Sequence, residues 1–363
     1  MAMGGRTARM AAILTAHQVP GATVAIRTPD GAVRHDNFGV RDMGAGVPMS
    51  SDTLLGIASV TKSFTALALC QLAEAGQLRL EDPVVRYLPD FRRLRLPAAD
   101  AVALHHLLSH SSGLPDYSRA LNLRTKWAHY TAAQQARWRA AEPDIGPAIN
   151  TVDDLLAAMA AEPAPPVGLP GERFHYSNEG FALLGTVIEL ASGQSYPDYL
   201  QRHVFDPLGM SRTTLAIPGP EHEPVTRLYE PSATGAPVEV PAWPQAPATL
   251  ADGFIRSTTD DLLRYLESFI EPGDERAGSV LSPAGRRRLA TPEVSVEMGC
   301  SYGLGWFLDE WRGSRRMFHT GSMSGVGSFV AVLPEVGTAV VVLSNLTTEG
   351  PARAVGEVLM EVE

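Results

Sequence analysis

The segment Ser59-Val60-Thr61-Lys62 begins a run of residues whose apolar members recur at helical spacing as far as Ala75, and Gly76 follows it. This pattern predicts a helix over 59–75, ended by a glycine that can adopt the left-handed conformation. Residues three apart on a helix share a face, so the Lys62 ammonium can reach the Ser59 hydroxyl. The helix dipole also favours negative charge at the N-terminus, where the serine becomes an alkoxide. Ser59 is therefore a candidate nucleophile.

Lysine is rare in this chain. The 363 residues include 30 lysines and arginines, and only Lys62 and Lys126 are lysines. A codon bias towards arginine explains the scarcity, but not why these two positions kept lysine. A lysine in a suitable environment can give up its proton and act as a base, whereas a guanidinium keeps its proton. Lys62 is therefore the candidate base for Ser59, while the sequence gives Lys126 no chemical role.

Composition and charge argue against several classes of protein. The formal net charge of −10 disfavours binding to nucleic acid or to anionic membranes. No apolar stretch approaches the 18 residues of a transmembrane helix. The first residues do not have the pattern of a signal peptide, so a cytoplasmic location is expected. Cys70 and Cys300 are too few for a disulfide framework.

The order of elements predicts an α+β fold. Strands are expected at 22–27, 32–40, 302–309, 315–320, 328–333 and 338–344. Helices are expected at 6–17, 105–109, 153–161, 179–192, 197–205 and 351–359, and after the capping pattern Ser257-Thr258-Thr259-Asp260. The proline-rich stretch 216–250 reads as a long surface excursion. We expect one catalytic domain over 1–363, with an α/β lobe from about 1–80 and 251–363 and a mostly helical lobe from about 81–250.

Two further motifs carry groups suited to catalysis. In the extended segment Tyr176-Ser177-Asn178, residues two apart point the same way, so a phenol and an amide would face one cleft. The alternative is a tyrosine that packs against the next helix and an asparagine that caps it. His319-Thr320-Gly321-Ser322 ends a predicted strand, where Gly321 would let a substrate backbone approach closely and pair with the strand. His319 could be neutral or cationic near pH 7.

Together, in this order, the three motifs resemble the signature of the serine β-lactamase and penicillin-binding protein family. That signature is Ser-x-x-Lys, then Tyr-x-Asn or Ser-Asp-Asn, then Lys-Thr-Gly. The sequence is most similar to the class C-like branch, which includes DD-carboxypeptidases, D-aminopeptidases, D-amino acid amidases and esterases. Segments 106–114, 205–210 and 302–306 also match. The resemblance covers about residues 15–345 and implies a β-lactamase/transpeptidase-like fold of two lobes, with the active site between the helical insertion and the sheet.

The resemblance also implies roles for these residues. Ser59 is the acylated nucleophile, Lys62 its base partner, and Tyr176 relays the proton to the leaving group and later helps to activate the deacylating water. Asn178 holds the acyl-side amide of the substrate. The backbone N–H groups of Ser59 and Ser322 form the oxyanion hole, and His319, Thr320 and Gly321 contact the substrate. Neither a metal nor an organic cofactor is implied.

The sequence departs from the family pattern at His319, which stands where β-lactamases have a lysine that helps to bind the substrate carboxylate. Histidine is seen there in peptidase and amidase members. We therefore expect a D-stereospecific amidase or peptidase acting on small amides or peptides, with a carboxylesterase as the alternative. A β-lactamase or a non-catalytic acyl-binding sensor is a minor alternative. The expected partner is a small-molecule substrate, and the oligomeric state is not determined by the sequence.

Three other patterns have competing interpretations. Gly299-Cys300-Ser301-Tyr302-Gly303 fits a hydrolase nucleophile elbow, but a strand pattern follows it instead of a helix. His105, His106 and His110 could suggest a metal, but no nearby acid or cysteine completes a ligand set. Residues 116–150, with Trp127, Tyr130 and Trp138, are either a plain surface segment or a wall of the acyl pocket that sets specificity.

Overall fold

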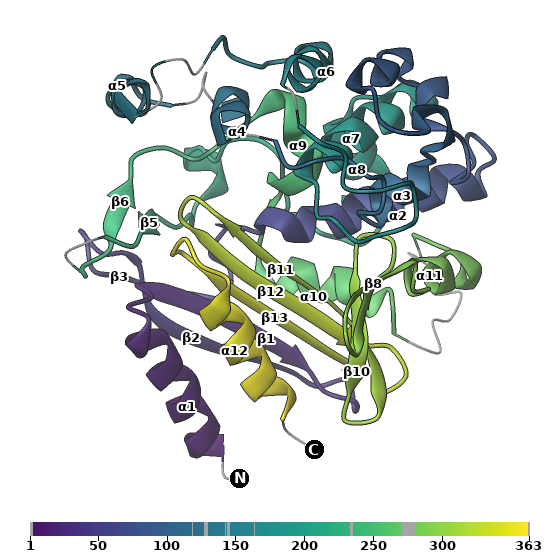
Figure 1. The fold of residues 1–363 in the computed structure, drawn as a ribbon. Coiled ribbons are helices and arrows are strands. Elements are labelled where there is room, and N and C mark those ends of the chain that lie inside the picture. The colour runs from purple at the N-terminus through teal and green to yellow at the C-terminus, as the bar shows by residue number, and fades with distance from the viewer. Residues whose placement is uncertain are drawn as a thin grey trace.

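The computed structural model describes residues 3–117, 119–126, 130–141, 143, 146–162, 164–232, 235–270 and 280–361. Within these residues, nine strands form one antiparallel sheet in the order β3-β2-β1-β13-β12-β11-β10-β9-β8. The strands are β1 (Gly21–Arg27), β2 (Val33–Asp42), β3 (Val47–Pro48), β8 (Val294–Glu297), β9 (Cys300–Tyr302), β10 (Phe307–Trp311), β11 (Ser314–Met323), β12 (Val326–Leu333) and β13 (Thr338–Ser344). Because β1 pairs with β13, the two ends of the chain build one sheet (Figure 1).

Helices cover both faces of this sheet. The terminal helices α1 (Met3–Ala16) and α12 (Gly350–Met360) pack on one face, where Met10, Phe329 and Val355 share a core. The other face receives α2 (Thr61–Glu74) and α10 (Thr259–Glu267), with α11 (Pro283–Leu289) packed on α2. Burial on both faces explains why β12 and β13 are nearly continuous apolar runs.

The middle of the chain forms a mostly helical region beside one end of the sheet (Figure 1). Its helices are α3 (Leu104–Leu108), α4 (Arg119–Lys126), α5 (Ala132–Ala141), α6 (Val152–Ala161), α7 (Asn178–Ser192), α8 (Tyr196–Leu200) and α9 (Leu250–Gly253). Thr151 caps α6, and Gly193 ends α7 in the left-handed conformation. The structure is therefore an α+β fold in which a helical section is inserted between strands of one sheet.

The proline-rich stretch 216–250 packs more closely on the rest of the chain than a surface excursion suggests. It contains a hairpin of β5 (Leu228–Glu230) and β6 (Val238–Val240). The buried Arg256 guanidinium donates hydrogen bonds to the carbonyl oxygens of Leu215, Pro244 and Phe254, at 2.8, 2.6 and 2.9 Å. Arg256 belongs to β7 (Arg256–Ser257), which pairs with β4 (Leu55–Gly56) just before Ser59. One arginine thus ties the proline-rich stretch to the segment that leads into the site.

The structure corrects three details of the predicted elements. The expected strand 302–309 is interrupted at Gly305, whose φ of +74° suits glycine and where a Cβ would lie 2.7 Å from Ala66 Cβ. Thr258, rather than Ser257, caps α10 by accepting the N–H of Asp261. The helix expected from Ser59 begins at Thr61, after a 3₁₀ turn.

Among the described helices, none is both long enough and apolar enough to cross a lipid bilayer.

Candidate active site

Ser59 lies in the 3₁₀ turn Ala58–Val60 that leads directly into α2. The preceding Ala58 has a φ of +47°, a left-handed conformation that costs about 1–2 kcal/mol for a residue with a Cβ. Two neighbours hold this turn in place: the Ile57 N–H donates to the Ile255 carbonyl at 3.0 Å, and Ser328 Oγ donates to the Ile57 carbonyl at 2.7 Å. Strain held by the surrounding structure is typical of functional positions.

Lys62, the second residue of α2, is fully buried and is surrounded by acceptors. Its Nζ lies 3.2 Å from Ser59 Oγ, 2.8 Å from Asn178 Oδ1 and 2.6 Å from the backbone carbonyl oxygen of Asp252. An ammonium has three hydrogens, and each has an acceptor here. A neutral amine in the same place would keep its two N–H groups on the two shorter bonds and point its lone pair at Ser59 Oγ. The site thus has the geometry for moving a proton between Ser59 and Lys62.

Tyr176 and Asn178 both face Lys62, the arrangement expected for residues two apart in an extended segment. Lys62 Nζ lies 4.9 Å from the centroid of the Tyr176 ring, while the Asn178 oxygen accepts its hydrogen bond. The helix is capped by Ser177, whose Oγ accepts the N–H of Gly180. Asn178 is therefore not the helix cap that the alternative interpretation proposed. With its oxygen held by Lys62, the Asn178 amide nitrogen remains as a donor in the pocket beside Ser59. The Tyr176 hydroxyl has no hydrogen-bond partner in the described part of the chain.

His110 positions the segment that carries Tyr176 and Asn178. Its carbonyl accepts the N–H of His175 at 2.7 Å, and its Nδ1 accepts the N–H of Ser177 at 3.0 Å. The imidazole centroid lies 4.1 Å from the centroid of the Tyr176 ring. Burial holds the pKa of His110 well below its usual range, with a further contribution from the charge of Lys62, so Nδ1 stays an acceptor. The sequence signal was the matching segment 106–114, which gave no role to this histidine.

The metal interpretation of the histidine cluster finds no support among the described residues, where no group of three or more potential ligands gathers. His106 Nδ1 accepts the Ala103 N–H at 3.0 Å, and His105 Nδ1 lies 3.1 Å from the Leu80 carbonyl. Both rings therefore contact backbone groups near the start of α3 or packed beside it. The elbow interpretation also fails, because Ser301 lies inside strand β9.

His319 was expected to contact the substrate, but it does not line the pocket. Its side chain is 1% exposed, is not part of the pocket lining, and its Nε2 lies 2.9 Å from the Tyr302 hydroxyl. Burial lowers the pKa of His319 to about 3, and the nearby charge of Lys62 contributes to this lowering. The imidazole is therefore neutral at physiological pH, and it packs against aromatic rings such as Phe307.

The rest of this strand meets the nucleophile directly. A Cβ on Gly321 would lie 2.5 Å from the Ile57 carbonyl oxygen and 3.0 Å from Ala58 Cβ. The neighbour that requires a glycine here is thus the segment before Ser59, and not a substrate backbone as the sequence suggested. Ser322 lines the same pocket as Ser59, and Thr320 and Gly321 do not. The two residues expected to supply oxyanion N–H groups therefore lie at one pocket.

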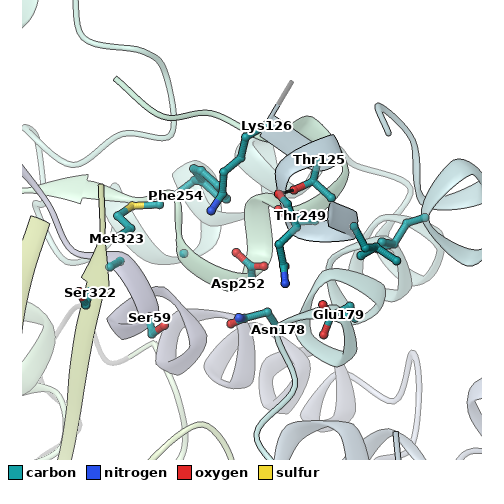
Figure 2. Close-up of a pocket in the computed structure, with 15 residues that line it drawn as sticks. Ser59, Thr125, Lys126, Asn178, Glu179, Thr249, Asp252, Phe254, Ser322 and Met323 are labelled. Atoms are coloured by element: carbon teal, nitrogen blue, oxygen red, sulfur yellow. Dashed lines mark hydrogen bonds between the residues drawn. The ribbon is translucent and has the colours of Figure 1, made fainter. Parts of the chain in front are cut away.

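This pocket contains charged residues that the motifs did not reveal. It is a cavity of about 80 Å³ whose lining joins Ser59, Asn178 and Ser322 to Lys126, Asp252 and Glu179 (Figure 2). Burial raises the pKa of Asp252 to about 7, against the lowering effect of Lys62 and Lys126. Burial also raises the pKa of Glu179 and lowers that of Lys126. Both lysines of the chain lie at the site, although only one belongs to a motif.

The segment 116–150 does wall the pocket, but through other residues than its aromatic ones. Helix α4 contributes Leu121, Asn122, Thr125 and Lys126 to the lining. Trp138 is not part of the lining, and Trp127 lies outside the described residues.

Comparison with known sequences finds a matching family and related proteins. The sequence profile of the family described as Beta-lactamase matches residues 7–362. Penicillin-binding protein 4 of Amycolatopsis lactamdurans is 28% identical over 348 residues, which cover 93% of this chain and 84% of that protein. Protein flp of Staphylococcus aureus (strain MW2) is 26% identical, and this chain spans only 60% of its length.

Solved structures agree with the fold. The octameric penicillin-binding protein homologue from Pyrococcus abyssi superposes with a TM-score of 0.82 at 30% identity, over 99% of this chain and 77% of that one. A D-stereospecific amidohydrolase from Streptomyces sp. superposes with a TM-score of 0.78 at 26% identity, over 97% and 96% of the two chains.

Proposed function

The chain belongs to the beta-lactamase family of serine hydrolases, which also contains the penicillin-binding proteins, and we propose that it hydrolyses D-amino acid amides or short D-residue peptides through an acyl-enzyme at Ser59. The observation that carries this proposal is the buried Lys62 Nζ, which lies 3.2 Å from Ser59 Oγ while Asn178 and the Asp252 carbonyl fix its other two bonds.

In the first half of the reaction, Ser59 Oγ attacks the carbonyl carbon of the amide as its proton passes to Lys62. The negative charge on the carbonyl oxygen falls to the N–H groups of Ser59 and Ser322, a type of stabilisation typically worth about 2.7–4 kcal/mol for each donor. The C–N bond then breaks, and the leaving nitrogen takes up a proton relayed through Tyr176. The products are an amine and an ester of Ser59.

In the second half, water attacks the ester carbonyl and gives one proton to the same relay. The bond to Ser59 Oγ breaks, the serine regains its proton, and a carboxylic acid leaves. Tyr176 suits both steps, because its ring lies beside Lys62 and its hydroxyl has no other partner among the described residues. Asn178 holds the acyl-side carbonyl through its amide nitrogen.

His319 supports an amide or peptide substrate over a β-lactam. A buried, neutral imidazole supplies no positive charge for the carboxylate that β-lactams carry. The fold-wide similarity to a D-stereospecific amidohydrolase supports the same choice and adds the stereochemical preference. A carboxylesterase acting on short, uncharged acyl esters would use the same groups, and it is the second candidate because the neutral His319 suits it equally.

A panel of substrates with the purified protein tests the proposal. D-phenylalanine amide, L-phenylalanine amide, p-nitrophenyl butyrate and nitrocefin are compared by kcat/KM, with Ser59→Ala as the control for background hydrolysis. We expect the D-amide to be hydrolysed well above the L-amide and nitrocefin. Ester hydrolysis without amide hydrolysis would favour the esterase, and a nitrocefin rate typical of a β-lactamase would refute the preference for amides over β-lactams.

A further inference from the structure

Lys126 extends from the C-terminal end of helix α4 into the pocket that contains Ser59 (Figure 2). The helix belongs to the inserted region, whereas Ser59 lies in the turn that leads into α2 and Ser322 lies in strand β11. The pocket is also lined by Asn178, so under the mechanism above it receives the acyl side of the substrate. Lys126 therefore lies where the acyl group must go.

The two lysines at this pocket differ in what their ammonium groups bind. All three hydrogens of Lys62 have acceptors within 3.2 Å. Lys126, in contrast, has no hydrogen-bond or ion-pair partner in the part of the chain that the structure describes. Its three donors are partly buried and face the cavity. A partly buried ammonium without acceptors is poorly stabilised, so an acceptor on the substrate would be bound strongly.

The two acidic groups of the pocket, unlike Lys126, have hydrogen-bond partners among the described residues. Glu179 accepts a hydrogen bond from Ser177 Oγ at 3.2 Å, and the Asp252 carboxylate accepts one from Thr249. Both carboxyl groups are buried enough for the pKa to rise, which favours their neutral forms. Among the charged residues described in the pocket, the unused hydrogen-bonding groups are therefore the donors of Lys126. An anion that can accept several hydrogen bonds, such as a carboxylate, would bind them.

We propose that Lys126 is a specificity-determining residue that pairs with a carboxylate on the acyl group of the substrate. This inference rests on the proposed function and narrows it to acyl groups with an acidic side chain, such as a D-glutamyl or D-aspartyl amide. Lys126 does not replace the lysine of the Lys-Thr-Gly motif, because it reaches the pocket from α4 and not from the strand that carries His319. Asp252 lines the same pocket, and because its pKa is raised to about 7, the fraction that is ionised near neutral pH repels a substrate carboxylate.

Matched substrates isolate the charge. D-Glutamic acid α-p-nitroanilide and D-glutamine α-p-nitroanilide differ only in a carboxylate against an isosteric amide. The mono-p-nitrophenyl esters of succinic acid and of succinamic acid make the same comparison without a D-amino acid. We expect the wild-type protein to favour the carboxylate by roughly 10- to 100-fold in kcat/KM within each pair, the range of a partly buried hydrogen bond to a charged group.

Three variants assign the preference to Lys126. Lys126→Met should bring the ratio close to one, chiefly through a higher KM for the carboxylate substrate, and Lys126→Glu should reverse it. Asp252→Asn should raise the ratio, because the partial negative charge of Asp252 near neutral pH no longer repels the substrate carboxylate. As a matched control, Arg124→Met removes a cation from the same helix but outside the pocket lining, and it should leave the ratio unchanged.

The outcomes separate this inference from the function on which it rests. A preference within the ester pair that Lys126→Met abolishes would support the role of Lys126 even if both nitroanilides were inert, a result that would refute the D-amidase proposal alone. An active enzyme with equal rates within each pair, or a preference that survives Lys126→Met, would overturn the role of Lys126. Inertness towards all four substrates would overturn the proposed function and this inference together.

Discussion

The neutral state of His319 has a consequence for stability that can be measured. Burial lowers the pKa of this group to about 3 from an ordinary value of 6.5. The unfolded chain therefore binds a proton at this histidine more readily than the native protein does. The contribution of the neutral His319 to the unfolding free energy is complete above about pH 6.5, and it is lost as the pH falls from 6.5 towards 3.

The size of the effect follows from the same two values. A pH of 5 is about 1.5 units below the pKa of this imidazole in the unfolded chain, whereas the native imidazole is still neutral at that pH. The unfolding free energy is therefore lower at pH 5 than above pH 6.5 by about 2 kcal/mol. Replacing the titrating group should remove this part of the pH dependence. We expect the fall in unfolding free energy between pH 7.5 and pH 5 to be smaller by about 2 kcal/mol in His319→Gln than in the wild-type protein.

Urea unfolding at the two pH values, followed by tryptophan fluorescence, measures this difference. The exposed His17 provides the matched control, and His17→Gln should keep the wild-type pH dependence. Imidazole carbon chemical shifts provide an independent readout, in which His319 should show no titration between pH 5 and pH 8. A titration of His319 near pH 6.5, or an unchanged pH dependence in His319→Gln, would refute the claim that the site lacks a cation at this position.

Three other substitutions test the chemistry and the scaffold around it. Lys62→Arg should lower kcat/KM by about 10²–10⁴, nearly as much as Lys62→Ala, because a guanidinium keeps its proton; a mostly active Lys62→Arg enzyme would contradict the role as base. Gly321→Ala should cost about 1–3 kcal/mol in urea unfolding and also lower kcat, because its Cβ would displace the Ile57 segment that precedes Ser59; unchanged unfolding and kcat would show that the contact is absent. Arg256→Met should destabilise the protein by about 3–5 kcal/mol, since three buried carbonyl groups lose their donor, and a loss below about 1 kcal/mol would mean that water replaces the guanidinium.

Local patterns were sufficient to predict much of this fold. The helix after Ser59, the hairpin of β1 and β2 and the C-terminal strands are each specified by spacing and turn residues within a few positions. That Lys62 and Asn178 share one site was implied by the resemblance to the family, and the hydrogen bond between them is seen in the structure. Recognition of the family came from the order of three motifs, and the profile match over 7–362 confirms it.

The remaining features depend on contacts between distant segments. The burial of His319 arises because Tyr302, from a strand two places away in the sheet, covers its ring. Lys126 reaches the pocket because α4 lies against the segment that leads into α9, which no local pattern around residue 126 indicates. The rarity of lysine was the only signal for Lys126, and its meaning needed the structure.

The central claim is that Ser59 is the nucleophile, and covalent labelling tests it most directly. The wild-type protein and Ser59→Ala are treated with a fluorescent serine-reactive phosphonate, and the labelled peptides are mapped by mass spectrometry. We predict one adduct per chain, on the peptide that contains Ser59, and no labelling of Ser59→Ala. Labelling that persists in Ser59→Ala, or an adduct that maps to another serine, would contradict the claim.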